Sequence, residues 1–125
     1  MSDHLLDTCV LIDYLRDDEA AVQVIRRLAR RPSVSVVTIA ELYAGVRNDR
    51  EREGIEALLA VIDVRNVDFE IARLAGGYRL QYRGSHGVAM PDALIAATAR
   101  VDGARLVTRN TRHFPMLDDL LVPYR

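Results

Sequence analysis

Three acidic residues interrupt the most apolar segments of the chain. Asp7 stands in "HLLDTCVLI", Glu41 in "TIAELYAGV" and Asp92 in "MPDALIAATA". An amide, Asn110, follows another apolar run in "LVTRNTRHF". Carboxylates that gather at one buried site repel one another and lose solvation, so such a site needs a compensating cation. Oxygen ligands without a Cys/His cluster favour Mg²⁺, with Mn²⁺ as an alternative, over Zn²⁺.

A magnesium site of this kind suits the hydrolysis of a phosphodiester bond. A metal with few protein ligands keeps positions open for water and for phosphate oxygens. It can then prepare a water as nucleophile, orient the phosphate and stabilise the leaving alkoxide. The predicted metal ligands are Asp7, Glu41 and Asp92, and the predicted catalytic residues are these three together with Asn110.

Each of these residues also has a purely structural explanation. Asp7 could cap the helix that follows it. Thr38 and Glu41 fit a capping box, in which Glu41 bonds back to the amide of Thr38. Asp92 lies at a helix start, where the dipole favours an acid, and Asn110 could be a turn residue. Singly these explanations are the better ones, but the apolar neighbours on both sides of each acid favour a shared site.

Strands and helices alternate along the whole chain. Strands are predicted over residues 5–7, 34–37, 61–67, 104–108 and 120–124. Helices are predicted over residues 8–15, 20–31, 38–46, 51–60, 69–82 and 91–101. The alternation predicts a mainly parallel sheet with helices on both faces, a three-layer α/β/α sandwich. Ligands of such folds bind beyond the carboxyl ends of the strands, which is where the acids fall.

Length and composition predict a single domain over residues 1–125. Half of the residues are apolar and 28% are charged, which suffices for a core without disulfides. One cysteine, no bilayer-spanning stretch and acid near the N-terminus together predict a cytoplasmic protein. A net charge of −1 argues against binding nucleic acid through bulk positive charge. All 17 basic residues are arginine, so a local phosphate-binding patch stays open.

Four motifs in order resemble those of PIN-domain ribonucleases, and more narrowly the VapC-type toxins of bacterial toxin–antitoxin pairs. They are "LLDTCVLIDYL", "VSVVTIAELYAGV", "MPDALIAATA" and "RLVTRNTRHF", and with their spacing they cover nearly the whole chain. The resemblance implies a PIN-like α/β/α fold and a Mg²⁺- or Mn²⁺-dependent endoribonuclease. It further implies an RNA substrate, a cognate VapB-type antitoxin and a homodimer.

The same resemblance matches Asp7, Glu41 and Asp92 to the first three acids of the family. The fourth position, often an aspartate, falls in "TRNTRHF", where Asn110 follows the strand. His113 stands where many relatives read "RDF". The fourth carboxylate is therefore missing, which leaves the number of bound metals open.

Residues next to Asn110 are candidates for contact with the RNA. Arg109 and Arg112 could bind phosphates, although surface solvation explains them equally well. Thr108 is also a candidate for contact with the RNA. The resemblance implies in addition that its hydroxyl supports the metal ligands. Apolar residues of the first helices could form an antitoxin groove or a dimer contact, with core packing as the alternative: Leu11, Tyr14, Leu15 and Leu42.

Two other functional classes fit the sequence less well. Phospho-acceptor receiver domains also place acids at strand ends, but they need a late lysine, and this chain has none. Phosphatases of the haloacid-dehalogenase type need a D-x-D motif, where this chain reads Asp7-Thr8-Cys9. A PIN-like domain that has weak catalysis and serves as a binding module remains an alternative, because the fourth carboxylate is missing.

Overall fold

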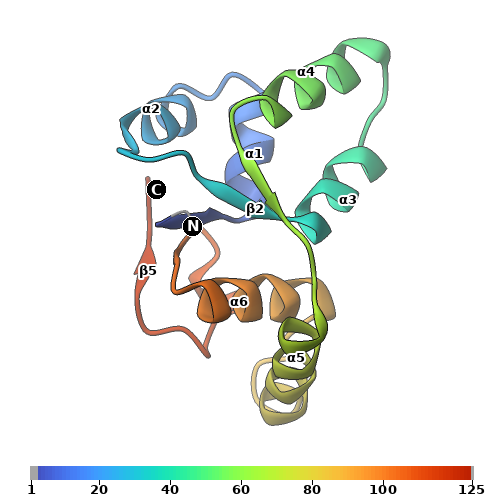
Figure 1. Cartoon of the computed structure of the whole chain (residues 1–125), viewed down its shortest axis with the longest axis vertical. Helices are drawn as coiled ribbons and strands as arrows, with labels where there is room; N and C mark the ends of the chain where they lie inside the picture. Colours follow the sequence, from blue (N-terminus) through green and yellow to red (C-terminus); the bar gives the residue numbers. More distant parts are fainter. Residues whose placement is uncertain (1–2, 125) are drawn as a thin grey trace.

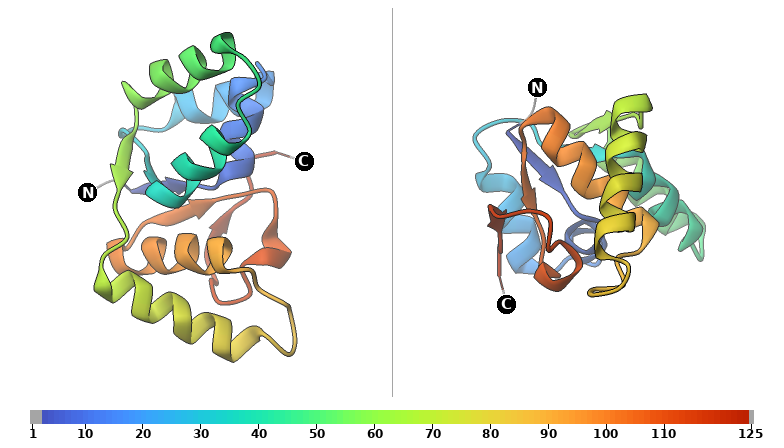
Figure 2. Two further views of the ribbon diagram at one scale, coloured as in Figure 1. Left: turned by 90° about the vertical axis from the view of Figure 1, so that its right-hand side faces the viewer. Right: turned by 90° about the horizontal axis from the view of Figure 1, so that it is seen from below.

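A five-stranded parallel sheet lies between two layers of helices in the computed structural model, which describes residues 3–124 (Figures 1 and 2). The strand order is β3-β2-β1-β4-β5, and every neighbouring pair is parallel. The strands are β1 (His4–Leu6), β2 (Ser33–Ser35), β3 (Asp63–Arg65), β4 (Arg105–Val107) and β5 (Leu120–Leu121). The predicted α/β/α sandwich is confirmed.

Six helices form the two outer layers. They are α1 (Thr8–Leu15), α2 (Glu19–Arg27), α3 (Val36–Ala44), α4 (Asp49–Leu59), α5 (Phe69–Tyr82) and α6 (Met90–Asp102). Figure 1 shows the first four on one side of the sheet and α5 with α6 on the other. None of the helices between residues 3 and 124 combines the length and apolar character that crossing a bilayer requires.

The sheet separates two hydrophobic cores. Leu5 and Leu106 point into the core that α5 and α6 cover, whereas Leu6 and Val107 point into the core beneath α1 and α4. Successive side chains of a strand face opposite sides, so each central strand supplies both cores. Burying a leucine fully contributes about 1.5–3 kcal/mol, and these two-sided strands therefore anchor the sheet.

Helix α6 is the more deeply buried helix of its layer, as expected from its alanine-rich sequence. Its residues Ala93, Ala96, Ala97 and Ala99 are almost completely buried. Pro91 lies in its first turn, where the missing N–H has no cost. The helix ends at Gly103, whose φ of 63° is the left-handed conformation that glycine adopts without strain.

The end of the second strand differs from the prediction. The β-branched run "VSVV" predicts a strand over 34–37, but the strand ends at Ser35, and Val36 begins α3. The reason is a cap, because the Ser35 hydroxyl accepts a hydrogen bond of 3.1 Å from the Val37 amide. Helix α3 thus starts two residues earlier than expected, which carries Thr38 into its first turn.

Three further boundaries are corrected by the structure. The helix predicted over 20–31 ends at Arg27, because Leu28 is extended with ψ at 128°. The strands predicted over 61–67 and 120–124 are reduced to Asp63–Arg65 and Leu120–Leu121. The segment that follows the fourth strand contains a short 3-10 helix, Thr111–His113.

Candidate active site

Asp7 lies where the sheet reverses its order of connection. The chain runs from β1 outward to β2 and β3 on one side, and β4 and β5 lie on the other side. The carboxyl ends of β1 and β4 therefore form a topological switch point, where α/β proteins bind ligands. The amide of Asp7 donates to the Val107 carbonyl at 3.0 Å, which continues the pairing of β1 with β4.

Asp7 is only 4% exposed, and its carboxylate accepts from three donors. The Thr8 amide donates to Oδ1 at 2.8 Å, so Asp7 does cap α1. The Thr108 hydroxyl donates to Oδ2 at 2.7 Å, and the Cys9 thiol donates to the same oxygen at 3.4 Å. Capping and a functional role are compatible here, because the second oxygen is held by groups that a cap does not need.

Glu41 is exposed on α3, and it is held by a residue of α1. The Thr8 hydroxyl donates to Glu41 Oε1 at 2.7 Å. The capping-box explanation is wrong, because Ser35 caps α3 and Thr38 is fully buried within the helix. Thr8 therefore contacts Asp7 through its amide and Glu41 through its hydroxyl.

Asp92 lies in the first turn of α6 and is half-buried. Burial is the main cause that raises the pKa of Asp92 above its ordinary value. The neighbouring His113, whose Nδ1 is 3.4 Å from Asp92 Oδ2, lowers this pKa, and the charges of Asp7 and Glu41 raise it. Asp92 therefore interacts electrostatically with both other acids, although the three lie on different elements.

The three acids have suitable chemistry for a hard cation but do not form a closed cage. Between residues 3 and 124, no three Asp, Glu, His or Cys side chains are grouped closely enough to hold a metal ion as they stand. Mg²⁺ commonly binds through one or two carboxylates and keeps several waters. An open site of that kind fits the donor set of Asp7, Glu41 and Asp92, and their role as ligands stays a prediction.

Asn110 lies in the loop that follows β4. The backbone N–H of Asn110 donates to the Thr108 hydroxyl at 2.9 Å, and the same hydroxyl donates to the Asp7 carboxylate. Its side chain does not cap the 3-10 helix that starts at Thr111. Asn110 is thus connected to Asp7 through Thr108, while the catalytic role of its side chain stays a prediction.

The neighbours of Asn110 differ in how well they could meet a substrate. Thr108 is fully buried, so it supports Asp7 and has no surface for a direct substrate contact. Arg109 pairs with Asp13 at 3.0 Å and lies over the ring of Tyr124, 5.7 Å from its centroid. Arg112 is exposed and forms no ion pair within residues 3–124. Arg112 is therefore the freer of the two predicted phosphate contacts.

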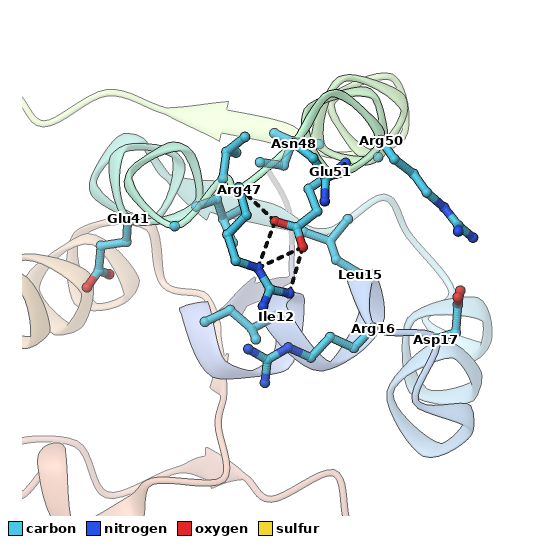
Figure 3. A pocket seen from close by; sticks show the side chains of 14 residues that line it. Ile12, Leu15, Arg16, Asp17, Glu41, Arg47, Asn48, Arg50 and Glu51 are labelled. Carbon is cyan, nitrogen blue, oxygen red and sulfur yellow. Dashed lines mark hydrogen bonds and ion pairs between the residues drawn. The ribbon is translucent and has the colours of Figure 1, made fainter.

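A groove of about 650 Å³ adjoins Glu41. Figure 3 shows Glu41 at one end and Arg47, held by Glu51 at 2.8 Å, further along. Leu15 and Leu42 line this groove, but Leu42 is also a buried core residue and Leu15 packs against the same core, so their contact with a partner stays a prediction. Leu11 is completely buried and Tyr14 packs against the same core, so core packing explains these two.

The sequence model of the PIN domain family matches residues 4–120. This chain belongs to the PIN-domain family. It is 40% identical over 124 residues to ribonuclease VapC19 and 42% identical over 123 residues to ribonuclease VapC10, both from Mycobacterium tuberculosis. These matches cover 96% of this chain and 98% and 92% of the two relatives. The resemblance to VapC-type proteins that the motifs predicted is confirmed.

A solved structure agrees with this assignment. A toxin–antitoxin complex from Klebsiella pneumoniae contains a chain that superposes with a TM-score of 0.84 at 26% identity. The match covers 97% of this PIN domain and 98% of that chain.

Some polar residues of the site were not predicted from the sequence. Thr8, Cys9 and Thr38 contact the acids or each other, and none was assigned a role there. Burial, followed by the Asp7 charge, raises the pKa of the Cys9 thiol, so Cys9 is a neutral donor rather than a thiolate ligand. A usable signal exists for Thr8, which directly follows Asp7 in the first motif.

Proposed function

We propose that this PIN domain is a divalent-metal-dependent endoribonuclease that serves as the toxin of a VapBC-type pair and acts on RNA in the cytoplasm. The observation that carries the proposal is that Thr8 bonds to both Asp7 and Glu41 beside the switch point of the sheet, with Asp92 near enough for both charges to raise its pKa. The relatives named ribonuclease VapC19 and VapC10 support the same activity.

The proposed cofactor is Mg²⁺, with Mn²⁺ as an alternative. Asp7, Glu41 and Asp92 would hold the ion, directly or through water. A bound divalent ion would supply an activated water and charge stabilisation at the phosphate. Burial of Asp7 and Asp92 favours this role, because an ion offsets the cost of keeping both carboxylates charged.

The residues of the chain would divide the remaining work. Glu41 is the most exposed of the three acids and is the proposed acceptor of the proton from the attacking water. Asn110 would orient that water or a ligand carboxylate through its side-chain amide. Thr108 would keep Asp7 Oδ2 in place, since it donates to that oxygen from a fully buried position.

Substitution of Asp7 tests the proposal. Asp7→Asn should abolish cleavage of total RNA in Mg²⁺ while the far-ultraviolet circular dichroism stays unchanged. EDTA should abolish cleavage by the wild-type protein. Asp118→Asn, an exposed acid near the amino ends of the strands, is the matched control and should cleave normally. Wild-type cleavage rates in Asp7→Asn would refute the site assignment.

The RNA would approach along the loop after β4. Arg112 is the proposed phosphate contact, because its guanidinium is exposed and unpaired among residues 3–124. Arg109 would join it only if its pair with Asp13 opened. The low aromatic content of 6% disfavours an extended base-stacking platform, so recognition of a structured RNA loop is proposed.

A VapB-type antitoxin and a second copy of the chain are the proposed protein partners. The solved complex from Klebsiella pneumoniae, to which the chain is similar, is called a toxin–antitoxin complex. The groove next to Glu41 offers the partly exposed apolar side chains of Ile12 and Leu15 for a protein contact. Co-expression with the protein encoded upstream, followed by size-exclusion chromatography with light scattering, tests both partners.

A second candidate function is that of a PIN-like binding module with little catalysis. Two observations favour it, namely Asn110 in the place of an acid and the open arrangement of the carboxylates. A titration of Mg²⁺ and Mn²⁺ in the RNA cleavage assay separates the two functions. RNA binding without cleavage at saturating metal would favour the binding module.

A further inference from the structure

The hydroxyl groups of Thr38 and Thr8 form a chain of hydrogen bonds that ends at the Glu41 carboxylate. The Oγ1 atom of Thr38 in α3 lies 3.0 Å from the Oγ1 atom of Thr8 in α1. The Thr8 hydroxyl lies 2.7 Å from Glu41 Oε1. Thr38 is fully buried, whereas Glu41 is exposed, so this chain of hydrogen bonds runs from the interior to the surface of the site.

The direction of these hydrogen bonds follows from the chemistry of the groups. An ionised carboxylate can only accept, so Thr8 gives its single hydroxyl proton to Glu41. The oxygen of Thr8 can then only accept from its neighbour, and Thr38 must be the donor. Hydrogen bonds that point the same way polarise one another, so the Thr38 hydroxyl strengthens the bond between Thr8 and Glu41.

Thr8 also joins two acids from different elements. Its amide donates to Asp7 Oδ1 at 2.8 Å, while its hydroxyl holds Glu41. An exposed glutamate otherwise samples several rotamers, and fixing it costs conformational entropy. We propose that Thr8 and Thr38 are positioning residues that fix the Glu41 carboxylate relative to Asp7. This inference rests on the proposed function, because it concerns the acids assigned there.

The inference predicts effects on both metal binding and catalysis. Groups that orient metal ligands typically contribute 10–100-fold to metal affinity or activity. The Thr8 hydroxyl should have the larger share, because it touches the carboxylate directly. The Thr38 hydroxyl acts through Thr8, so its loss should have a smaller effect.

Four variants test this inference in the full-length protein. Thr8→Val and Thr38→Val remove the hydroxyls with little change of volume, and Thr8→Ser restores the donor. Thr98→Val is the matched control, because Thr98 is as buried as Thr38 and its hydroxyl donates to the Leu94 carbonyl rather than into the chain that ends at Glu41. The measurements are Mn²⁺ binding by electron paramagnetic resonance without RNA, and kcat and KM for RNA cleavage.

Thr8→Val should weaken Mn²⁺ binding and lower kcat about 10–100-fold with little change in KM. Thr8→Ser should recover most of both losses, and Thr38→Val should lie between Thr8→Val and the wild type. Thr98→Val should bind Mn²⁺ and cleave RNA like the wild type. In the metal-free wild-type protein, the Thr38 hydroxyl proton should exchange slowly enough to be seen by NMR.

Wild-type Mn²⁺ affinity in Thr8→Val would overturn the inference. So would a Thr8→Ser variant as impaired as Thr8→Val, because the methyl group rather than the hydroxyl would then matter. A wild-type protein that binds no Mn²⁺ would overturn the inference together with the metal role. The predicted order of Mn²⁺ affinities without any RNA cleavage would refute only the proposed ribonuclease activity.

Discussion

Single residues of this candidate site combine helix-start positions with contacts that a helix start does not require. Asp7 caps α1 through Oδ1 and accepts the Thr108 and Cys9 donors through Oδ2. Asp92 lies in a helix first turn, where the dipole favours it, yet burial raises its pKa. The structural explanations of these acids are therefore partly correct, and they do not exclude a role in catalysis.

Asp92→Asn should abolish RNA cleavage and stabilise the metal-free protein. Because the folded pKa of Asp92 is raised, its contribution to stability is complete below the ordinary value of 3.8 and is lost as pH rises through the folded value. At pH 7 the charged side chain therefore destabilises the fold. In EDTA at pH 7, the Tm of Asp92→Asn should exceed that of the wild type by roughly 1–3 °C.

The pH dependence of this Tm difference tests whether the charge of Asp92 is its cause. Near pH 3 the wild-type carboxyl is protonated, so the Tm difference between the two proteins should vanish. A lower Tm for Asp92→Asn at pH 7 in EDTA would show that the contact with His113 outweighs the cost of burial.

At the scale of elements, the helices beside the central strands carry the acids, with Asp7 and Asp92 at helix starts and Glu41 in the second turn of α3. Asp7 precedes α1. Glu41 lies on α3, which follows β2, and Asp92 lies on α6, which precedes β4. The alanines of α6 are buried in the core that the helix shares with α5 and with Leu5 and Leu106 of the sheet, and their small side chains allow close packing there. Close packing of this helix is therefore a condition for the position of Asp92.

Ala96→Leu should destabilise the protein by about 1–3 kcal/mol, because added methyl groups overfill a packed core. Ala96 is completely buried on α6. Ala72→Leu on α5, where the alanine is exposed, is the control and should change stability by less than about 0.5 kcal/mol. Urea denaturation measures both, and equal stability of the two variants would contradict tight packing at α6.

A second link between elements lies at the C-terminal end. The Tyr124 hydroxyl donates to Asp13 Oδ2 at 2.6 Å, and Arg109 pairs with the same oxygen at 3.0 Å. Burial, followed by the bond to Asp13, raises the pKa of Tyr124 well above its ordinary value of 10. This cluster connects α1, the loop after β4 and the end of the chain.

Tyr124→Phe should lower the free energy of unfolding by about 1 kcal/mol at pH 7, the value of one hydrogen bond. The raised folded pKa means that Tyr124 contributes fully below pH 10 and that this contribution is lost as pH rises further. The advantage of the wild type should therefore shrink above pH 10 in urea denaturation. Tyr43→Phe, an exposed tyrosine, is the control, and a constant advantage would contradict the linkage.

At the scale of the whole molecule, the strand order decides where the site lies. The reversal between β1 and β4 places Asp7 beside the residues that follow Val107. The two hydrophobic cores hold the helices of both layers against this edge of the sheet. Under the proposed function, residues far apart in the sequence would share one ion, which should couple metal binding to folding.

Mn²⁺ should stabilise the folded protein, because the unfolded chain cannot gather the three acids. A free concentration 100 times the Kd corresponds to about 2.7 kcal/mol. Thermal unfolding in Mn²⁺ and in EDTA measures the gain. Asp92→Asn should gain less than the wild type, whereas Asp118→Asn should gain as much, and an equal gain in all three proteins would place the ion elsewhere.

The sequence by itself determined the fold class and the candidate acids. Alternating apolar strands and amphipathic helices have only a few ways to bury both faces of a sheet, so the α/β/α sandwich followed from the pattern. Acids within apolar segments are costly, which made Asp7, Glu41 and Asp92 conspicuous. Helix and strand ends were less predictable, because Val36 and Val37 favour strands while the Ser35 cap starts a helix.

Only the tertiary structure decided which polar groups contact these acids. Thr8 to Glu41, Thr108 to Asp7 and Tyr124 to Asp13 join residues separated by 33, 101 and 111 positions. Such pairs leave no local periodicity or spacing, because they depend on the strand order and on how the two helix layers pack. The sequence therefore identifies the candidate acids, whereas their orientation depends on long-range contacts that only the tertiary structure makes.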